Sequence, residues 1–246
     1  MTVERGNGWT MHIGDCLDVM ATLEQVDHVM SDPPYDNATH RPGAARTNKG
    51  GKANNIVIDF ASFTDADLRA YVAHTLRLSR RWCVAFGAIE QMGDYKRAAG
   101  ESWVRAAIWD RPDGTPQLSG DRPAQSAEGI ALWHLARPMR WNGKGKRGTY
   151  RCGVEREDRE HPTQKPIGLM LELVTDFTDR GEAVLDAFAG SGTTGVACLR
   201  LGRTFVGIEK DPKYFAFACE RLRAEEGQST LHAQRAGQLG LLGGAK

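Results

Sequence analysis

Apolar residues along this chain occur in two kinds of pattern. Seven short, mostly apolar runs predict strands at 11–13, 26–30, 82–86, 104–109, 130–135, 183–188 and 204–208. Apolar residues three or four positions apart predict helices at 16–23, 63–80, 166–177, 193–201 and 212–225. Strands that alternate with helices indicate an α/β fold with a mostly parallel sheet and helices on both faces.

Composition and length are those of an ordinary folded protein. The 246 residues are 41% hydrophobic and 26% charged, with a formal net charge of +1. This length predicts one domain over 1–226 and a weakly structured tail over 227–246, which is rich in Gly, Gln and Ala. The chain has no apolar run of the roughly 20 residues that cross a bilayer and no secretory signal, so we expect a cytoplasmic protein. The five widely spaced cysteines indicate reduced thiols, with no spacing typical of zinc.

A glycine-rich turn separates a predicted strand from a predicted helix. It lies in residues 185–195, Leu-Asp-Ala-Phe-Ala-Gly-Ser-Gly-Thr-Thr-Gly, and such a turn brings the backbone close to a nucleoside cofactor. Glu209 ends the next predicted strand, near the spacing of an acid that binds a ribose. Val196 stands where a triphosphate-binding loop needs lysine, which argues against such a loop. A dinucleotide and S-adenosylmethionine both fit; the shortness of the remaining chain favours the second.

The tetrapeptide Asp32-Pro33-Pro34-Tyr35 directly follows another predicted strand. Prolines cannot continue a sheet ladder, so the tetrapeptide belongs at the carboxyl end of that strand, where parallel sheets bind ligands. The lone pair of an amine on a nucleobase is delocalised into the ring, and the Asp32 carboxylate and Pro33 carbonyl can draw it out by accepting the amine hydrogens. Tyr35 would stack on a base flipped out of its duplex. For an isolated tetrapeptide, a proline turn closed by an aspartate is the alternative.

Together, the tetrapeptide and the glycine turn resemble the amino-DNA methyltransferases of the circularly permuted beta group, in which the catalytic tetrapeptide precedes the cofactor loop. Three more segments stand in the family's order: Gly14-Asp15-Cys16, His161-Pro162-Thr163-Gln164-Lys165-Pro166 and Phe205-Val206-Gly207-Ile208-Glu209. The resemblance implies a Rossmann-like, circularly permuted methyltransferase fold with a mostly parallel seven-stranded sheet. It also implies a catalytic unit at 11–36, a cofactor unit at 161–225, and target-recognition and DNA-contact loops at 36–55, 111–129 and 137–160.

The same resemblance implies the site residues. The catalytic residues would be Asp32, Pro33, Pro34 and Tyr35. Asp15 should contact the adenine amine of the cofactor, Glu209 its ribose, and Lys165 its methionine carboxylate. The whole cofactor-binding set is Asp15, Cys16, Asp32, Thr163, Gln164, Lys165, Phe188, Ala189, Gly190, Ser191, Gly192, Thr193, Thr194, Glu209 and Lys210. We expect no metal.

Two basic segments contain no acidic residue. Residues 137–151 carry six basic side chains interleaved with Trp141 and Tyr150, and residues 39–53 carry four. Solvated loops are the plain alternative, but the interleaved aromatic rings favour contact with nucleic-acid phosphates. The expected DNA-binding residues are Arg41, Arg46, Lys49, Arg140, Lys144, Lys146, Arg147 and Arg151.

The expected function is transfer of a methyl group from S-adenosyl-L-methionine to the N6 amine of adenine in duplex DNA, at a specific site, by base flipping. The N4 amine of cytosine is the alternative, because an Asp in the first place of the tetrapeptide favours adenine only statistically. The chain has no Pro-Cys dipeptide, which argues against methylation at a cytosine ring carbon. An RNA base or a protein glutamine as the substrate, a nicotinamide-dependent oxidoreductase and a non-catalytic DNA-binding protein are further alternatives. A homodimer and a cognate restriction endonuclease are left open.

Overall fold

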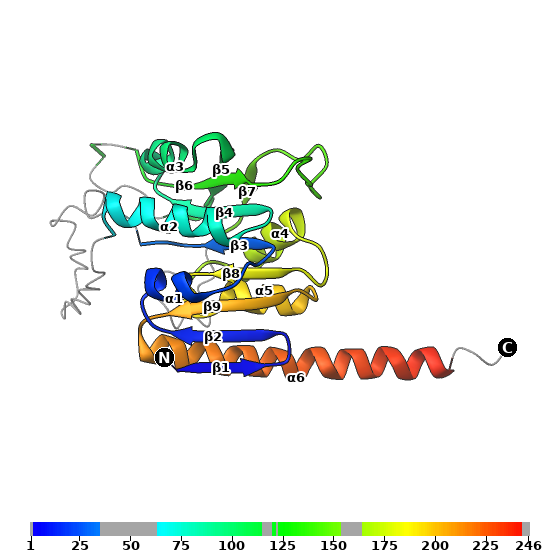
Figure 1. Cartoon of the computed structure of the whole chain (residues 1–246). Coiled ribbons are helices and arrows are strands. Elements are labelled where there is room, and N and C mark those ends of the chain that lie inside the picture. The colour runs from blue at the N-terminus through cyan, green and yellow to red at the C-terminus, as the bar shows by residue number, and fades with distance from the viewer. Residues whose placement is uncertain (1, 35–62, 115–119, 122, 154–163, 243–246) are drawn as a thin grey trace, which may run out of the picture.

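A computed structural model of the chain describes residues 2–34, 63–114, 120–121, 123–153 and 164–242, with side chains up to residue 227. One sheet lies between two layers of helices (Figure 1). Its strands are β1 (Val3–Gly6), β2 (Trp9–Ile13), β3 (His28–Ser31), β4 (Trp82–Gly87), β5 (Trp103–Asp110), β6 (Ala127–His134), β7 (Thr149–Arg151), β8 (Ala183–Asp186) and β9 (Thr204–Glu209). The helices are α1 (Cys16–Thr22), α2 (Asp65–Leu78), α3 (Met92–Ala99), α4 (Ile167–Phe177), α5 (Thr193–Arg200) and α6 (Pro212–Leu242), with short 3-10 turns η1 (Ile89–Gln91) and η2 (Gly100–Ser102).

The described strands form a mixed sheet in the order β1-β2-β9-β8-β3-β4-β6-β5-β7. The neighbours from β2 to β4 pair in parallel, as do β5 and β7, whereas β6 is antiparallel to both β4 and β5, and β1 is antiparallel to β2. The prediction of a seven-stranded sheet is therefore wrong, because the described residues already form nine strands. The two added strands, β1 and β7, are the edges. Each is short and largely polar, so its apolar pattern is too weak to detect.

Each face of the sheet is covered by three of the described helices. Helices α1, α2 and α3 supply one core, to which α2 contributes Leu68, Tyr71 and Val72. Helices α4, α5 and α6 supply the other, to which α4 contributes Leu169 and Leu173. Helix α3 was not predicted, because it buries only Tyr95 and Ala99 and its remaining positions are mostly polar. The predicted α/β architecture with helices on both faces is confirmed.

Helix α6 is much longer than predicted. It continues to Leu242, so the tail expected to be weakly structured is helical to that residue, and its last turns project beyond the sheet (Figure 1). Ala, Gln, Leu and Arg have good helix propensity, and each interior glycine costs only about 1 kcal/mol, which explains the difference. Neither α6 nor another helix of the described residues is long and apolar enough to cross a membrane.

The directions of the strands determine at which edge of the sheet their carboxyl ends lie. Strands β2, β9, β8, β3 and β4 all finish at one edge of the sheet, which we call the carboxyl edge. Because β6 is antiparallel to β4, β6 begins at this edge and finishes at the opposite one, the amino edge. Loops that follow parallel strands meet at a carboxyl edge, which is where such sheets bind ligands.

Candidate active site

The described parts of the two predicted motifs meet at the carboxyl edge. Strands β3 and β8 are neighbours, with Val29 opposite Leu185. One residue before Asp32, the buried Ser31 hydroxyl accepts a hydrogen bond of 2.9 Å from the backbone N–H of Ala187. This bond joins segments 156 positions apart. The start of the tetrapeptide and the start of the glycine turn therefore lie side by side.

The turn between β8 and α5 needs glycine at two positions. Gly190 and Gly192 have φ angles of 51° and 77°, in the left-handed region that favours glycine. A Cβ atom at Gly192 would also lie 3.1 Å from the Cβ of Ala218 on α6. The Gly190 N–H donates a hydrogen bond of 2.8 Å to Oε2 of Glu209. The backbone of the turn is thus held against the acid at the end of β9.

Asp186, the last residue of β8, stabilises the turn by hydrogen bonds. Its carboxylate accepts hydrogen bonds from the backbone N–H of Phe188 (3.0 Å) and the hydroxyl of Thr194 (2.6 Å). Burial raises the pKa of Asp186 to about 6, and the charge on Asp32 adds to this, while hydrogen bonds with Thr194, Phe188 and Ser31 oppose it. The hydroxyl of Thr194, expected at the cofactor, instead bonds within the protein.

Arg221 of α6 holds the other side of the turn. Its guanidinium donates hydrogen bonds to the backbone carbonyl of Ser191 (2.6 Å) and to the hydroxyl of Thr193 (3.2 Å). Ser191 and Thr193 are both buried, and their hydroxyl oxygens lie 3.2 Å apart. The turn is therefore fixed by the protein itself, and Gly190 is its half-buried glycine.

Two further acids emerge beside the turn. Ile13 of β2 pairs with Glu209 of β9, and Asp15 follows two residues after Ile13, where it caps α1 by accepting a hydrogen bond from the N–H of Leu17 (2.9 Å). Burial raises the pKa of Glu209, whereas the hydrogen bonds that its carboxylate accepts from backbone N–H groups lower this pKa. The predicted pair of acids, Asp15 and Glu209, is thus brought to one edge by adjacent strands.

Cys16 and Lys210 flank these acids. Burial, and then the charge of Asp15, raise the pKa of the Cys16 thiol to about 12, so it is a neutral group that packs at the start of α1. The positive charge of the exposed Lys210 opposes that rise.

Lys165 forms an ion pair with Asp32, the first residue of the tetrapeptide. Its ammonium lies 2.5 Å from Oδ2 of Asp32 and 3.4 Å from Oε2 of Glu128, at the start of β6. Burial alone would lower the pKa of Lys165, but the carboxylates of Asp32 and Glu128 outweigh it and raise the pKa above its ordinary value. Lys165 was expected to bind a cofactor carboxylate; here its partners are the catalytic candidate and a second acid. Pro33 is buried beside this pair and Pro34 is half-buried.

The residues at this edge fit the cofactor expected from the sequence. Carboxylates at Asp15 and Glu209 are acceptors for amine and hydroxyl donors, and the glycine turn allows close approach of a ligand. Oε1 of Gln164 is buried and accepts no hydrogen bond from the described part of the chain, so a ligand amine would satisfy it. Within that same part, no group of three or more metal-ligating side chains was found.

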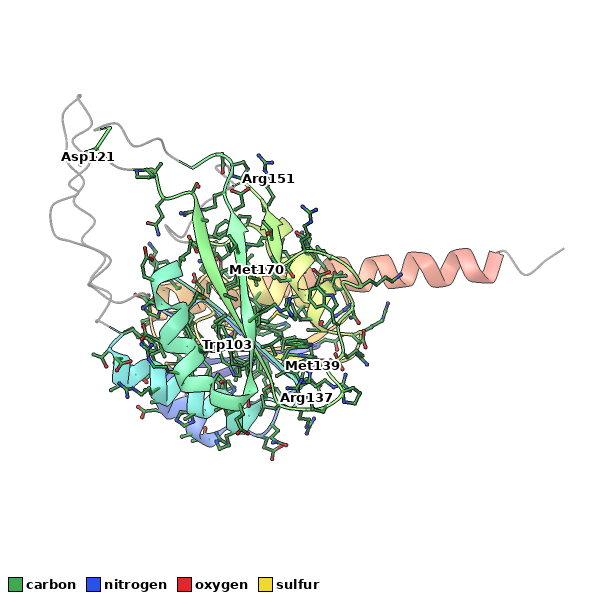
Figure 2. The ribbon with its side chains drawn as sticks, turned by 90° about the horizontal axis from the view of Figure 1, so that it is seen from above. Trp103, Asp121, Arg137, Met139, Arg151 and Met170 are labelled. Atoms are coloured by element: carbon green, nitrogen blue, oxygen red, sulfur yellow. The ribbon has the colours of Figure 1, made fainter. Side chains whose placement is uncertain are left out.

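The predicted DNA-binding residues that the structure describes are not all gathered at the carboxyl edge. Figure 2 shows Arg137 and Met139 toward the end that holds Trp103, away from Arg151. Trp103 begins β5, which is antiparallel to β6, so this is the amino edge. The expected contact loop at 137–160 therefore starts at the far edge, crosses the molecule and includes β7, and the last three residues of the loop at 111–129 belong to β6.

Three of the five predicted basic residues that the structure describes have acidic partners within the protein. Arg140 pairs with Asp179 and Glu182, which precede β8 at the amino edge, so Arg140 is poorly placed for DNA held at the opposite edge. Lys146 lies 2.6 Å from both Glu172 and Asp176 of α4.

Arg151 lies 3.6 Å from Asp110, and a pair this exposed contributes little to stability. Lys144 and Arg147 are exposed and form no ion pair with another described residue. They remain the better candidates for phosphate contact.

Some predicted residues lie outside the described part of the chain. They are Tyr35, Arg41, Arg46, Lys49 and Thr163, together with the whole loop at 36–55.

Sequence reasoning missed four residues that build the site: Ser31, Glu128, Asp186 and Arg221. Asp186 had a detectable signal, because an acid that ends a buried strand before a glycine turn is placed to accept the turn's N–H groups. Ser31, Glu128 and Arg221 had none, because each acts on a segment far away in the chain.

Sequence comparisons with known proteins find similarity to DNA methyltransferases. The family described as DNA methylase, N6_N4_Mtase, matches residues 125–220. The type II methyltransferase M.HinfI of Haemophilus influenzae is 26% identical over 243 residues, which cover 85% of this chain and 67% of that protein. The findings support an amino-DNA methyltransferase.

Solved structures of the same kind share the fold. The crystal structure of an M1.HpyAVI–SAM complex is similar with a TM-score of 0.67 at 23% identity, covering 87% of this chain and 98% of that one. The PvuII DNA methyltransferase, described as cytosine-N4-specific, is similar with a TM-score of 0.68 at 15% identity, covering 87% and 86%. At these identities the likeness establishes the fold, a mixed α/β sheet with helices on both faces.

Proposed function

We propose that this protein transfers the methyl group of S-adenosyl-L-methionine to the exocyclic N6 amine of adenine at a specific site in duplex DNA. The observation that carries the proposal is the hydrogen bond between Ser31 and Ala187, which places Asp32 beside the glycine turn. An amine acceptor next to a nucleoside-binding turn is what direct methyl transfer to a base requires. The similarity to type II methyltransferases supports DNA as the substrate.

In this proposal the cofactor is held at the carboxyl edge by residues of four segments. Asp15 accepts from its adenine amine, Glu209 from its ribose hydroxyls, and Gln164 from its methionine amine. The backbone of the turn around Gly190 approaches its sugar and methionine parts. The M1.HpyAVI–SAM complex, which shares the fold, supports this choice of cofactor.

Bound S-adenosyl-L-methionine supplies an electrophilic methyl group on a sulfonium. The protein's task is to make the amine nucleophilic and to aim it. The Asp32 carboxylate accepts one amine hydrogen and the Pro33 carbonyl accepts the other, which directs the nitrogen lone pair towards the methyl group. When the nitrogen forms its bond to the methyl carbon, the carbon–sulfur bond would break and leave a neutral thioether, and ionised Asp32 would accept the proton that the nitrogen loses.

Access to the amine requires the base to leave the duplex, and Tyr35 is proposed to stack on it. The chain order supports the permuted arrangement, because the catalytic strand β3 precedes the cofactor strand β8 although the two are neighbours in the sheet. Residues 1–226 are proposed as one methyltransferase domain, with target recognition by loops at 36–55 and 111–129.

The test is methyl transfer from labelled cofactor to duplex DNA, followed by digestion to nucleosides. We expect the label in N6-methyladenine. An Asp32→Asn variant should lose at least 100-fold in rate, while Asp18→Asn, an exposed acid on α1, should retain full activity. Label in N4-methylcytosine would overturn the choice of adenine and keep DNA methyl transfer, an outcome that the fold also accommodates. Absence of label in any base would refute the proposal.

A further inference from the structure

Asp32 is the first of four charged side chains of alternating sign that form a cluster: Asp32, Lys165, Glu128 and Arg111. Lys165 contacts Asp32 and Glu128, and Glu128 in turn lies 3.0 Å from Nη1 of Arg111, just after β5. Asp32 is the most exposed of the three that meet at Lys165: its side chain is 25% exposed, against 10% for Lys165 and 10% for Glu128. The cluster therefore reaches from the reacting edge into the protein.

Aromatic rings limit where the ammonium of Lys165 can sit. Its Nζ atom lies 4.8 Å from the ring centre of Phe86 and 5.6 Å from that of Trp109. Arg111 also lies over Trp109, at 5.5 Å. Such cation–π contacts hold a desolvated cation against the ring face. The contacts with both rings thus hold the ammonium of Lys165 beside Asp32 and Glu128.

The sharing of one ammonium affects what Asp32 can do. A carboxylate that is fully engaged by a buried ammonium is a weaker acceptor for a neutral amine, because the nearby positive charge lowers its basicity. Glu128 competes for the same ammonium, and removing one acid from such a buried cluster would leave the cation to the other. Because the pKa of Lys165 is raised, the lysine keeps its proton and acts by its charge.

We propose that Glu128 is a positioning residue for methyl transfer: anchored by Arg111, it draws the Lys165 ammonium partly away from Asp32 and so preserves the ability of Asp32 to accept hydrogen from the target amine. The inference rests on the proposed function and adds to it a residue of β6 that lies outside both sequence motifs.

The cluster predicts opposite effects for two substitutions. Glu128→Gln removes the charge that competes with Asp32 for the Lys165 ammonium, so the rate of a single turnover at saturating cofactor and DNA should fall at least tenfold. The acid limb of its pH profile should move to lower pH, because the ammonium then favours ionised Asp32. Arg111→Gln frees Glu128 to attract Lys165 more strongly, so the limb should move to higher pH. Tyr95 of α3 and Asp186 of β8 also feel the charge of Asp32 and are kept unchanged in both variants.

Glu225 provides a matched control. As whole residues, Glu128 and Glu225 are both 8% exposed, and Glu225 also pairs with an arginine, Arg200, at 2.9 Å, but it lies on α6. Glu225→Gln should leave the pH profile in place. A double variant, Glu128→Gln with Lys165→Met, should regain rate at saturating cofactor relative to Glu128→Gln alone, because both competing charges are gone.

The titration of the Asp32 carboxyl carbon by NMR reads the same change without substrate. We expect its midpoint to fall in Glu128→Gln and to rise in Arg111→Gln. A midpoint that moves in neither variant would overturn the inference, as would a Glu128→Gln rate within threefold of the original protein. Failure of the proposed function has a different result: the protein without any substitution then methylates no base in DNA.

Discussion

Removal of the Ser31 hydroxyl tests the contact that joins the two halves of the site. Ser31 and Ala187 are each only 2% exposed, so Ser31→Ala leaves the Ala187 N–H buried without its acceptor. A lost hydrogen bond contributes about 1 kcal/mol, and an unsatisfied buried donor costs about 1–3 kcal/mol. We expect the free energy of unfolding to fall by about 2 kcal/mol.

The same substitution should weaken the cofactor site. Without the bond, the start of the glycine turn is no longer tied to β3, and binding must restore its position. If this costs about 1.4 kcal/mol, the dissociation constant for S-adenosyl-L-methionine rises about tenfold. Urea unfolding measures the first effect and isothermal titration calorimetry the second.

Ser79 offers a control with comparable burial at the other edge. It is 1% exposed, and its hydroxyl donates to the Trp82 carbonyl at 3.2 Å and accepts from the N–H of Arg81. Ser79→Ala should lower stability by a similar amount and leave cofactor affinity unchanged. Equal losses of affinity in the two serine variants would show that the Ser31 effect is general destabilisation, and would refute the reasoning.

Three other predictions concern individual charges. Glu209→Gln replaces a carboxylate oxygen that accepts a backbone N–H by an amide nitrogen that cannot, so calorimetry should show at least tenfold weaker cofactor binding, and unchanged binding would exclude Glu209 from the site. The pKa of Asp186, raised to about 6 from 3.8, makes the folded protein bind a proton more readily than the unfolded chain, so this group's contribution to stability is present below about pH 4 and is lost as the pH rises through 6. The difference in free energy of unfolding between the original protein and Asp186→Asn, measured by urea unfolding, should fall by about 3 kcal/mol across this range. Replacing Lys144 and Arg147 together by Gln should weaken DNA binding and reduce the slope of log K against log salt by about 2, and an unchanged slope would place the DNA surface elsewhere.

Much of the fold could be predicted because it depends on local patterns. All seven predicted strands and all five predicted helices are confirmed, with ends shifted by a few residues, apart from α6. Elements with weak apolar patterns, such as β1, β7 and α3, were missed because their stability comes from neighbours already in place. The length of α6 was underestimated because isolated glycines were given too much weight against good helix formers.

Candidate site residues could likewise be predicted where they depend on local patterns, and not where they depend on distant segments. Asp32 and Gly190 were found because strand-ending prolines and glycine turns have local signatures. The acidic partners of Lys146 and Arg140 could not be predicted, because their basic segment has no acid of its own and the partners lie on α4 and before β8. A charge run predicts a free basic surface only if folding brings no acid beside it.

The sequence alone determined the order of strands and helices, the left-handed turn that only glycine accommodates, and the two proline bonds after β3. Tertiary structure decided which strands became neighbours, and hence that Ser31 bonds to Ala187 and that Lys165 lies between Asp32 and Glu128. Backbone geometry depends on residues a few positions apart, whereas hydrogen bonds and ion pairs at the carboxyl edge depend on strand order, which no short stretch of sequence encodes.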